Sequence, residues 1–280
     1  MIKPWVNFAF LYQPERIEFL KIALKTLSEW PVEKLMILIT INNIGNEISA
    51  FEESLRSSHN NIVLNSVDIT NVDPRILQWD HKNFLARFLD SEYTHFIYAD
   101  ADLVINYHIM DYWVKTKEMF DKYSKGFIPG TFRFENYNNS IRSVDTTYRT
   151  DIPTLKLINI NNQWFFSPQE PFQGVSIMDK ELALEHLNSP YVNLDSVGIH
   201  GFGYGETAIS AYIFENPPNG YTHRILIPLD NYEDCWIQHL PNNYAANSFK
   251  EHGKIHAYTM FQTIINQTKS YLNFMRGNLC

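Results

Sequence analysis

Two aspartates, Asp100 and Asp102, are the residues of this sequence whose type and spacing point most directly to chemistry. They are separated by one alanine and lie at the end of the apolar run 95–104. Aspartate is a poor strand former, so a pair that closes an apolar strand needs a reason. In extended backbone, residues i and i+2 point to the same side, where the two carboxylates would converge. Such a pair suits Mg²⁺ or Mn²⁺ carrying substrate phosphates; a plain Asp-rich turn is the structural alternative.

The segments before this pair alternate between predicted strands and helices. Strands are expected at 6–12, 34–41, 61–68 and 95–100, and helices at 14–29, at 74–89 and ahead of Arg56. This order predicts a parallel sheet with right-handed crossovers. Ligands of such sheets bind beyond the carboxyl ends of the strands, where Tyr12, Asn42 and the aspartate pair all fall.

The rest of the chain predicts a mixed arrangement. Helices are expected at 109–123, 180–187, 206–214 and 258–274, and strands at 126–135, 174–178 and 224–229. The stretch 136–167 is polar and predicts a long irregular loop. No repeat or linker interrupts the pattern. We therefore expect one α/β domain over 1–280, with a nucleotide-binding half at 1–104 and a second half at 105–280 that completes the acceptor and metal sites.

Composition narrows the classes of function. The 280 residues suffice for a sizeable core, and the net charge of -8 argues against non-specific nucleic-acid binding or a basic membrane-binding face. Aromatic residues make up 15%, which suits stacking on sugars or bases and equally fills a core. The two cysteines predict neither a disulfide framework nor a zinc cluster. Without a leader pattern or an apolar window of about 18 residues, we expect a cytoplasmic protein, at most peripheral to the inner face of a membrane.

Four short segments carry a resemblance to glycosyltransferases of the A-type (GT-A) fold, in particular to exostosin-like and related bacterial D-x-D transferases. No single segment is specific, but the ordered set is. The segments are 78–85 (QWDHKNFL), similar to a W-x-H-[RK] segment; 126–135, similar to a G-F-x-R-[YF]-E strand with an insertion; 171–174 (PFQG), similar to an N-P-x-Q-[AG] turn; and 234–244 (DCWIQHLPNNY), similar to a D-x-W-x-x-H-L-P-N-[KN]-Y tail.

The resemblance implies a GT-A-like fold with a Rossmann-like parallel half, and a metal site. In such enzymes Mn²⁺ or Mg²⁺ bridges the aspartates and the diphosphate of a nucleotide-sugar, and it neutralises the charge that develops on the leaving group. We expect Asp102 to contact the metal directly, Asp100 to bind the ribose or to contact the metal through water, and His239 to be the third ligand. A buried histidine packed beside Trp236 is the alternative for His239.

Further donor-binding residues follow from the same comparison. Tyr12, Gln13 and Asn43 follow the first two strands, where the base and ribose lie in this fold, and Tyr12 would stack on the base. Asn43 is also an ordinary turn residue. His81 and Lys82 precede the aspartates, and Lys82 is expected to contact phosphate, with a solvated helix face as the alternative.

Glu206 is the expected catalytic carboxylate. It follows the glycine-rich loop 198–205 and opens a predicted helix. In an inverting enzyme it would take the proton of the acceptor hydroxyl; an acidic residue favoured by the helix dipole is the alternative. Arg133 is expected to pair with phosphate or with Glu135. Aromatic residues that form either an acceptor platform or a core cluster are Trp164, Phe165, Phe166 and Phe172.

These residues together favour a metal-dependent glycosyltransferase that moves a sugar from a nucleotide-sugar to a glycan or lipid-linked acceptor in polysaccharide biosynthesis. Two alternatives stay open. A metal-dependent nucleotidyltransferase or phosphohydrolase would be expected to have a glycine-rich phosphate loop or further carboxylates. A non-catalytic glycan-binding protein would bind its ligand without turnover.

Overall fold

A computed structural model describes residues 1–56, 61–144, 155–168, 174–198, 201, 203–210, 213, 215–247 and 253–277. The chain divides into two compact units. Unit 1 consists of Met1–Tyr107 and Phe172–Glu215, and unit 2 of His108–Pro171 and Asn216–Cys280. The predicted functional halves 1–104 and 105–280 stay predictions.

Unit 1 is built on a five-stranded sheet with the strand order β11-β4-β1-β2-β3. Four strands are parallel, and β11 is antiparallel to β4. Because helices cover both faces, the central strands are apolar almost without alternation. The predicted α/β class with a parallel N-terminal sheet is confirmed. The strands are β1 (Pro4–Phe10), β2 (Met36–Asn42), β3 (Ile62–Val67), β4 (His95–Asp100) and β11 (Val175–Asp179).

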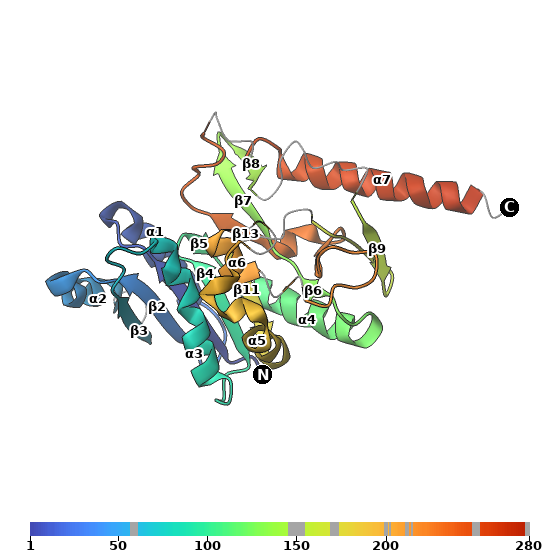
Figure 1. The fold of residues 1–280 in the computed structure, drawn as a ribbon. Coiled ribbons are helices and arrows are strands. Elements are labelled where there is room, and N and C mark those ends of the chain that lie inside the picture. Colours follow the sequence, from blue (N-terminus) through green and yellow to red (C-terminus); the bar gives the residue numbers. More distant parts are fainter. Residues whose placement is uncertain are drawn as a thin grey trace. The chain divides into compact units, whose positions relative to one another are not determined.

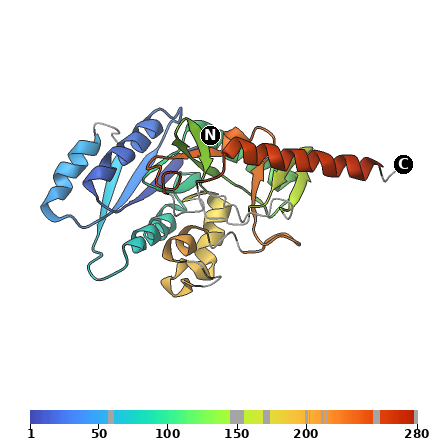
Figure 2. The ribbon, with the colours of Figure 1, turned by 90° about the horizontal axis from the view of Figure 1, so that it is seen from above.

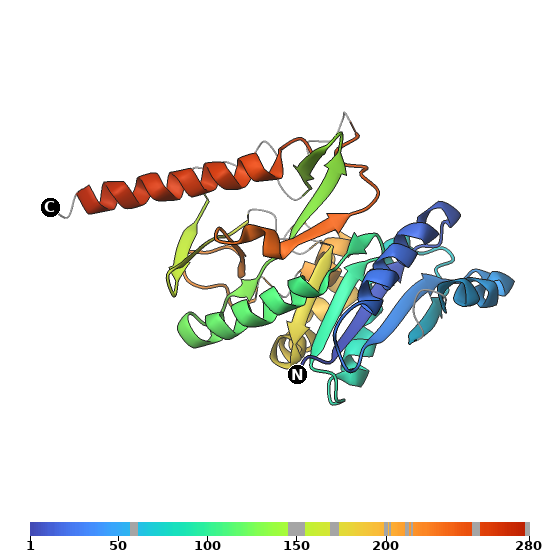
Figure 3. The ribbon, with the colours of Figure 1, turned by 180° about the vertical axis from the view of Figure 1, so that it is seen from behind.

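Right-handed crossovers place the helices of unit 1 on opposite faces of this sheet. The steps from β1 to β2 and on to β3 run in one direction, whereas β4 returns to the other side of β1. One face is therefore covered by α1 (Ile17–Ser28) and α2 (Ile48–Arg56) (Figures 2 and 3). The other face carries α3 (His81–Phe88), α5 (Lys180–Asn188) and α6 (Tyr204–Ser210) (Figure 1).

The helix predicted at 74–89 is two elements. A 3₁₀ segment, η3 (Pro74–Trp79), precedes α3, and Asp80 lies between them. Tertiary contacts explain the break: the Trp79 indole donates to the Tyr204 carbonyl at 3.0 Å, and the Asp80 carboxylate accepts from Thr40 at 3.1 Å. Side-chain bonds to neighbouring elements thus override helix propensity at this position.

The two aspartates do not share one extended segment. Asp100 is the last residue of β4, and Ala101 and Asp102 form a turn before the short strand β5 (Leu103–Val104). The expectation that the pair converges through extended i, i+2 geometry is therefore wrong for the backbone, because the chain turns directly after Asp100.

Unit 2 contains two small sheets and two long helices, α4 (Tyr107–Tyr123, its first residue in unit 1) and α7 (Ala257–Gly277). One sheet has the order β6-β12-β10-β9, with β6 (Ile128–Pro129), β12 (Ile225–Pro228), β10 (Gln163–Phe166) and β9 (Leu157–Ile160). In the other, β7 (Phe132–Tyr137) pairs with β8 (Ser140–Ser143) and β13 (Trp236–His239). A buried cluster joins α4 to the first sheet: Phe120, Phe127, Ile160, Phe165 and Leu226.

The irregular loop predicted at 136–167 is wrong for much of its described length. Its residues form the hairpins β7–β8 and β9–β10. Both turn pairs, Asn138-Asn139 and Asn161-Asn162, have positive φ between 49° and 64°. Two left-handed residues in a row are the signature of a two-residue type I′ turn, whose twist matches a hairpin. The two asparagine pairs, whose residue type favours a loop, form the turns of these two hairpins.

None of the helices in the described part of the chain combines the length and hydrophobicity that a bilayer-spanning helix needs.

Candidate functional site

Asp100 is held at the carboxyl end of β4 by two donors. Its Oδ1 accepts a hydrogen bond from the Tyr98 hydroxyl at 2.8 Å and from Gln78 Nε2 at 3.1 Å. Burial, and then the charge of Asp100, raise the pKa of the Tyr98 phenol well above its usual value, so it stays a donor. The Asp100 carboxylate is therefore fixed in direction before any ligand arrives.

Asp102 lies in the turn that follows and faces a cation. Its side chain is 8% exposed, and its Oδ2 is bound by Arg16 Nη2 at the end of the 3₁₀ segment η1 (Pro14–Arg16). The Arg16 side chain is 37% exposed. A guanidinium therefore already occupies a position on Asp102 that a divalent cation would take, so the local chemistry fits a positive ion. Two carboxylates from the protein, with oxygens from a bound phosphate, are a common Mg²⁺ environment.

Gln78 connects Asp100 to the start of α6. A Cβ added at Gly205 would lie 2.4 Å from Gln78 Oε1, so any other residue here would require the Gln78 side chain to shift. Glu206 follows in the first turn of α6 and is half-buried. Arg75 interacts electrostatically with Glu206. The structure therefore brings the predicted catalytic carboxylate to the segment that supports Asp100.

The residues that follow β1 and β2 form a second group at the same end of the sheet. The Tyr12 amide donates to Asn42 Oδ1 at 2.7 Å, and its hydroxyl donates to Glu47 Oε2 at 3.2 Å. Gln13 is the extended residue before η1, and Asn43 accepts from the Gly45 amide at 2.9 Å as a turn residue. Tyr12 and Gln13 thus lie just before η1, which ends at Arg16.

His81 and Lys82 are both buried, at 1% and 4% exposure. The His81 ring packs 4.9 Å from the Tyr98 ring, so it supports the residue that holds Asp100. Lys82 Nζ donates to the Tyr191 carbonyl at 2.6 Å and lies 3.6 Å from the centre of the Trp79 ring. Burial lowers the pKa of Lys82 to about 7. Lys82 lines a groove of about 890 Å³. Asp100, Asp102 and Tyr12 do not line this groove.

In unit 2, Glu135 orients His239. The fully buried Glu135 accepts from His239 Nδ1 at 2.7 Å, from the Tyr244 amide at 3.2 Å and from the Ala245 amide at 2.5 Å. Burial acts to raise the pKa of Glu135, but these hydrogen bonds outweigh it and the pKa is lowered. With the proton held on Nδ1, the Nε2 atom of a neutral imidazole carries the lone pair that binds metals.

Of the other predicted residues, some are buried in unit 2, Trp164 is half-buried, and the rest lie outside the described residues. Phe165 and Phe166 are 1% and 4% exposed, which agrees with the core alternative. Arg133 is also buried. Outside the described residues lie positions 171–173 of the turn segment, Phe172 among them, and residues 199, 200 and 202 of the glycine-rich loop.

Sequence reasoning assigned no role to Arg16, Gln78, Tyr98 or Glu47, and saw Glu135 only as a partner for Arg133. Tyr98 was open to prediction, because it lies two residues before Asp100 on the same face of a strand. The role of Arg16 could not be predicted from the sequence, because 86 positions separate it from Asp102. Among the described residues, no group of three or more His, Cys, Asp or Glu side chains could by itself hold a metal ion.

No protein-family model and no curated protein sequence matches the chain. Among solved structures, it is similar to residues 1–349 of S. aureus TarS in complex with UDP, at 14% identity and a TM-score of 0.43, over 80% of this chain and 57% of that chain. It is also similar to the apo-form glycosyltransferase GlyE of Streptococcus pneumoniae TIGR4, at 14% identity and a TM-score of 0.43, over 97% of this chain and 64% of that chain. The chain therefore spans less than two thirds of either structure.

Proposed function

We propose that this chain is a glycosyltransferase that uses a nucleotide-sugar donor together with Mn²⁺ or Mg²⁺. The observation that carries the proposal is the pair of fixed carboxylates at the carboxyl end of a parallel sheet. Asp100 is held by Tyr98 and Gln78, and the nearly buried Asp102 is bound to the guanidinium of Arg16. Ligands of open α/β sheets bind at this edge.

In this proposal Asp102 and Asp100 hold the divalent cation together with oxygens of the donor diphosphate. A contact of His239 with the cation stays a prediction. When bound, the cation supplies charge neutralisation for the departing nucleoside diphosphate. Arg16 has to leave Asp102 for the cation to bind, which its partly exposed position permits. The guanidinium is then available for a donor phosphate, which it would bind through two parallel hydrogen bonds.

The donor nucleotide would lie against Tyr12, Gln13 and Asn43. The Tyr12 ring is positioned by the hydrogen bond of its hydroxyl group to Glu47 and by edge contacts with Phe10 and Phe51 at 6.4 and 5.5 Å. A base stacked on this ring gains dispersion and burial of apolar surface. His81 would act indirectly, through Tyr98. A phosphate contact from Lys82 stays a prediction.

Glu206 would act as general base on the acceptor, a hydroxyl group of a free or lipid-linked glycan. Its carboxylate takes the hydroxyl proton while the oxygen attacks the anomeric carbon and the bond to the nucleoside diphosphate breaks. The electron pair of that bond leaves with the diphosphate. Such a reaction would invert the configuration at the anomeric carbon.

The proposal is tested by thermal denaturation with UDP, GDP and CDP, each with and without Mn²⁺. A ligand that binds only the folded state raises Tm by an amount set by its concentration over Kd. We expect one nucleotide to raise Tm, and only when Mn²⁺ is present. Asp102→Asn should abolish this rise.

Asp90→Asn is the matched control, because Asp90 is an exposed aspartate of the same unit that lies before β4 rather than after it. It should keep the full rise. If no nucleotide raises Tm in the presence of Mn²⁺, or if Asp102→Asn keeps the rise, the proposal fails. A rise that persists without added metal and in the presence of a chelator would overturn the metal dependence alone.

A further inference from the structure

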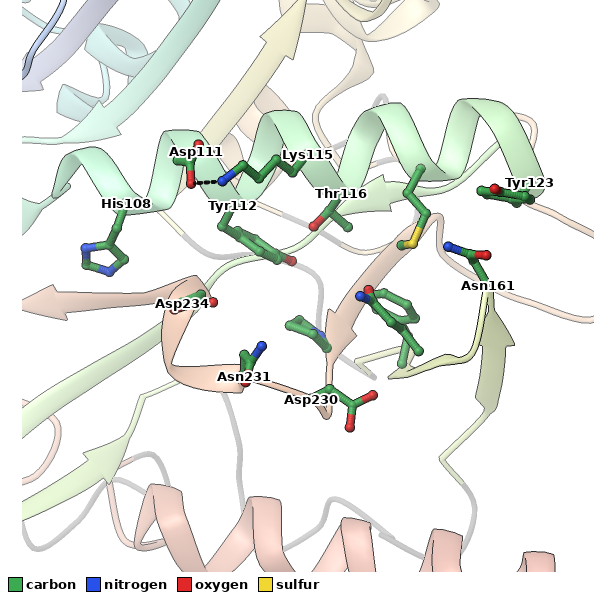
Figure 4. A pocket seen from close by; sticks show the side chains of 14 residues that line it. His108, Asp111, Tyr112, Lys115, Thr116, Tyr123, Asn161, Asp230, Asn231 and Asp234 are labelled. Atoms are coloured by element: carbon green, nitrogen blue, oxygen red, sulfur yellow. Dashed lines mark hydrogen bonds and ion pairs between the residues drawn. The ribbon is translucent and has the colours of Figure 1, made fainter.

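A groove of about 390 Å³ lies within unit 2 (Figure 4). One wall is α4, from which His108, Tyr112 and Thr116 project toward the opposite wall. That wall is the segment after β12, which carries Asp230, Asn231 and Asp234. None of the catalytic, nucleotide-binding or metal-binding residues predicted above lines it. The groove is therefore open to a function beyond the proposed transfer reaction.

The floor of the groove is rigid and partly apolar. Phe165 lines it at 1% exposure and packs against Phe120 with ring centres 5.1 Å apart. The Tyr112 hydroxyl donates to the Gly130 carbonyl at 2.9 Å, which fixes the direction of its ring. At the end of α4, Tyr123 exposes 51% of its surface beside Asn161 (Figure 4). The base is thus closed by a buried aromatic ring, and accessible aromatic surface lies at one end of the groove.

The rim carries amide groups and carboxylates on short, well-supported turns. Asn161 and Gln163 come from the β9–β10 turn and the first residue of β10. Asp230 Oδ2 accepts from the Trp164 amide at 3.1 Å, which ties the segment after β12 to β10. Asn231 has φ of 51° and precedes the 3₁₀ segment η9 (Tyr232–Cys235), which contains Asp234. Amides both donate and accept hydrogen bonds, and carboxylates accept them.

The charges of the rim distinguish between classes of ligand. Three carboxylates line the groove, from Asp111, Asp230 and Asp234, against one ammonium group, Lys115, which is paired with Asp111 at 2.5 Å. This excess of negative charge repels phosphates and nucleotides. A cationic ligand is itself a hydrogen-bond donor, so it would not pair with the donor groups of the amides and of Lys115. A neutral ligand with many hydroxyl groups uses all of these partners.

We propose that this groove binds a saccharide, as one or two neutral sugar residues of a glycan. Sugar hydroxyls would donate to Asp230 and Asp234 and exchange hydrogen bonds with Asn161 and Asn231. The apolar C–H face of a ring would lie on an aromatic side chain, for which the exposed Tyr123 is the accessible platform. The volume is near the lower end of the roughly 300–1,000 Å³ of small-molecule sites, which suits a short segment of glycan.

The test is saturation-transfer difference NMR on the full chain with neutral disaccharides, without nucleotide or metal. The probes are N,N′-diacetylchitobiose, lactose, maltose and mannobiose at millimolar concentration, with trilysine as the cationic counterpart. We expect at least one disaccharide to bind and trilysine not to bind. Asn231→Gly removes an amide while glycine tolerates its positive φ, and Tyr123→Ala removes an exposed ring, so neither change should disturb folding. Each variant should weaken disaccharide binding by about tenfold or more.

Asn138→Gly is the matched control, since Asn138 has a similar φ of 49° in unit 2 but lies outside the groove. It should bind the disaccharide as the unaltered chain does. Absence of binding by every disaccharide, binding of trilysine alone, or equal binding by all three variants would each overturn the proposal. Because nucleotide and metal are left out, this result is independent of the thermal test of the transfer reaction.

Discussion

At the scale of single residues, Glu135 holds His239 in a buried hydrogen-bond network, and a substitution of Glu135 tests this network. Its two oxygens accept three hydrogen bonds, two of them from backbone amides. Glu135→Gln would place an amide donor against donors and leave at least one buried group unpaired. We expect the free energy of unfolding to fall by about 1–3 kcal/mol. Urea denaturation measures this, with the exposed Glu118→Gln as a control that should lose little. Equal stability of both variants would contradict the network.

Lys82 should make stability depend on alkaline pH. Burial lowers its pKa from 10.5 to about 7, so between these values the unfolded chain binds a proton that the folded protein lacks. The free energy of unfolding should therefore rise as pH increases from about 7 toward 10. Lys82→Met removes the cost of the buried amine and should stabilise the protein at pH 7 by about 1–3 kcal/mol. Urea denaturation at pH 7 and pH 9 checks both statements.

The exposed Lys25 supplies the control for this change. Lys25→Met should leave both the stability at pH 7 and its rise with pH close to those of the unaltered chain. If Lys82→Met instead destabilises the protein at pH 7, its hydrogen bond to Tyr191 and its contact with Trp79 outweigh the burial of the charge.

Two buried histidines should make stability depend on acid pH. His81 and His186 stack with ring centres 5.8 Å apart. Burial, followed by the nearby Lys82 charge, lowers the pKa of His81 from 6.5 to about 3 and that of His186 well below 6.5. Below pH 6.5 the unfolded chain gains protons that the folded protein does not. Stability should then fall with decreasing pH, by up to about 1.4 kcal/mol per pH unit for each histidine.

His186→Leu distinguishes the contribution of this histidine pair from other causes of the loss of stability at acid pH. It removes one of the two differential protonations, so the fall in stability between pH 6 and pH 5 should become clearly shallower. Urea denaturation at a series of pH values gives the two slopes. Identical slopes would show that His186 does not stay neutral in the folded protein.

At the scale of elements, the asparagine pairs show which features of the sequence were misread. Asn139 has φ of 57° in the turn between β7 and β8. Glycine adopts this conformation freely, whereas a β-branched residue is strained there. Asn139→Val should therefore destabilise the protein by about 1–3 kcal/mol, and Asn139→Gly should change stability little. Thermal or urea denaturation of the two variants decides; equal loss in both would rule out the left-handed turn.

Regular elements of unit 1 were predictable because local pattern and tertiary environment agree. Apolar runs such as 36–42 are strands covered on both faces, and their order determines the parallel sheet. The candidate site was predictable only in part. The roles of Asp100 and Glu206 stay predictions, but both residues were predicted from their positions at the end of a strand and at the start of a helix. Their partners were not, since the contacts of Gln78 with Asp100 and Gly205 depend on tertiary packing that no local pattern contains.

At the scale of the whole molecule, the two units are not consecutive along the chain. Unit 1 takes its first segment from Met1–Tyr107 and its second from Phe172–Glu215. The second segment supplies β11, which pairs with β4, and the Asp100 amide donates to the Gly174 carbonyl at 2.9 Å. It also supplies Ala208 and Ile209, which are buried with Trp79 and Tyr98. The site segment of β4 is therefore completed by residues far along the chain.

This interleaving predicts how fragments of the chain behave. A fragment of residues 1–107 keeps β1 beside β4 but leaves the other edge of β4 unpaired. It also exposes the apolar surface that α5 and α6 cover, so it should lack a cooperative unfolding transition. Joining 1–107 to 172–215 through a flexible Gly/Ser linker restores both partners and should restore a cooperative transition. Urea denaturation followed by circular dichroism compares the two fragments. Cooperative unfolding of 1–107 alone would show that the N-terminal β-α repeats form a complete core without β11, α5 and α6. A joined fragment that stays unfolded would show that unit 1 depends on unit 2 for its stability.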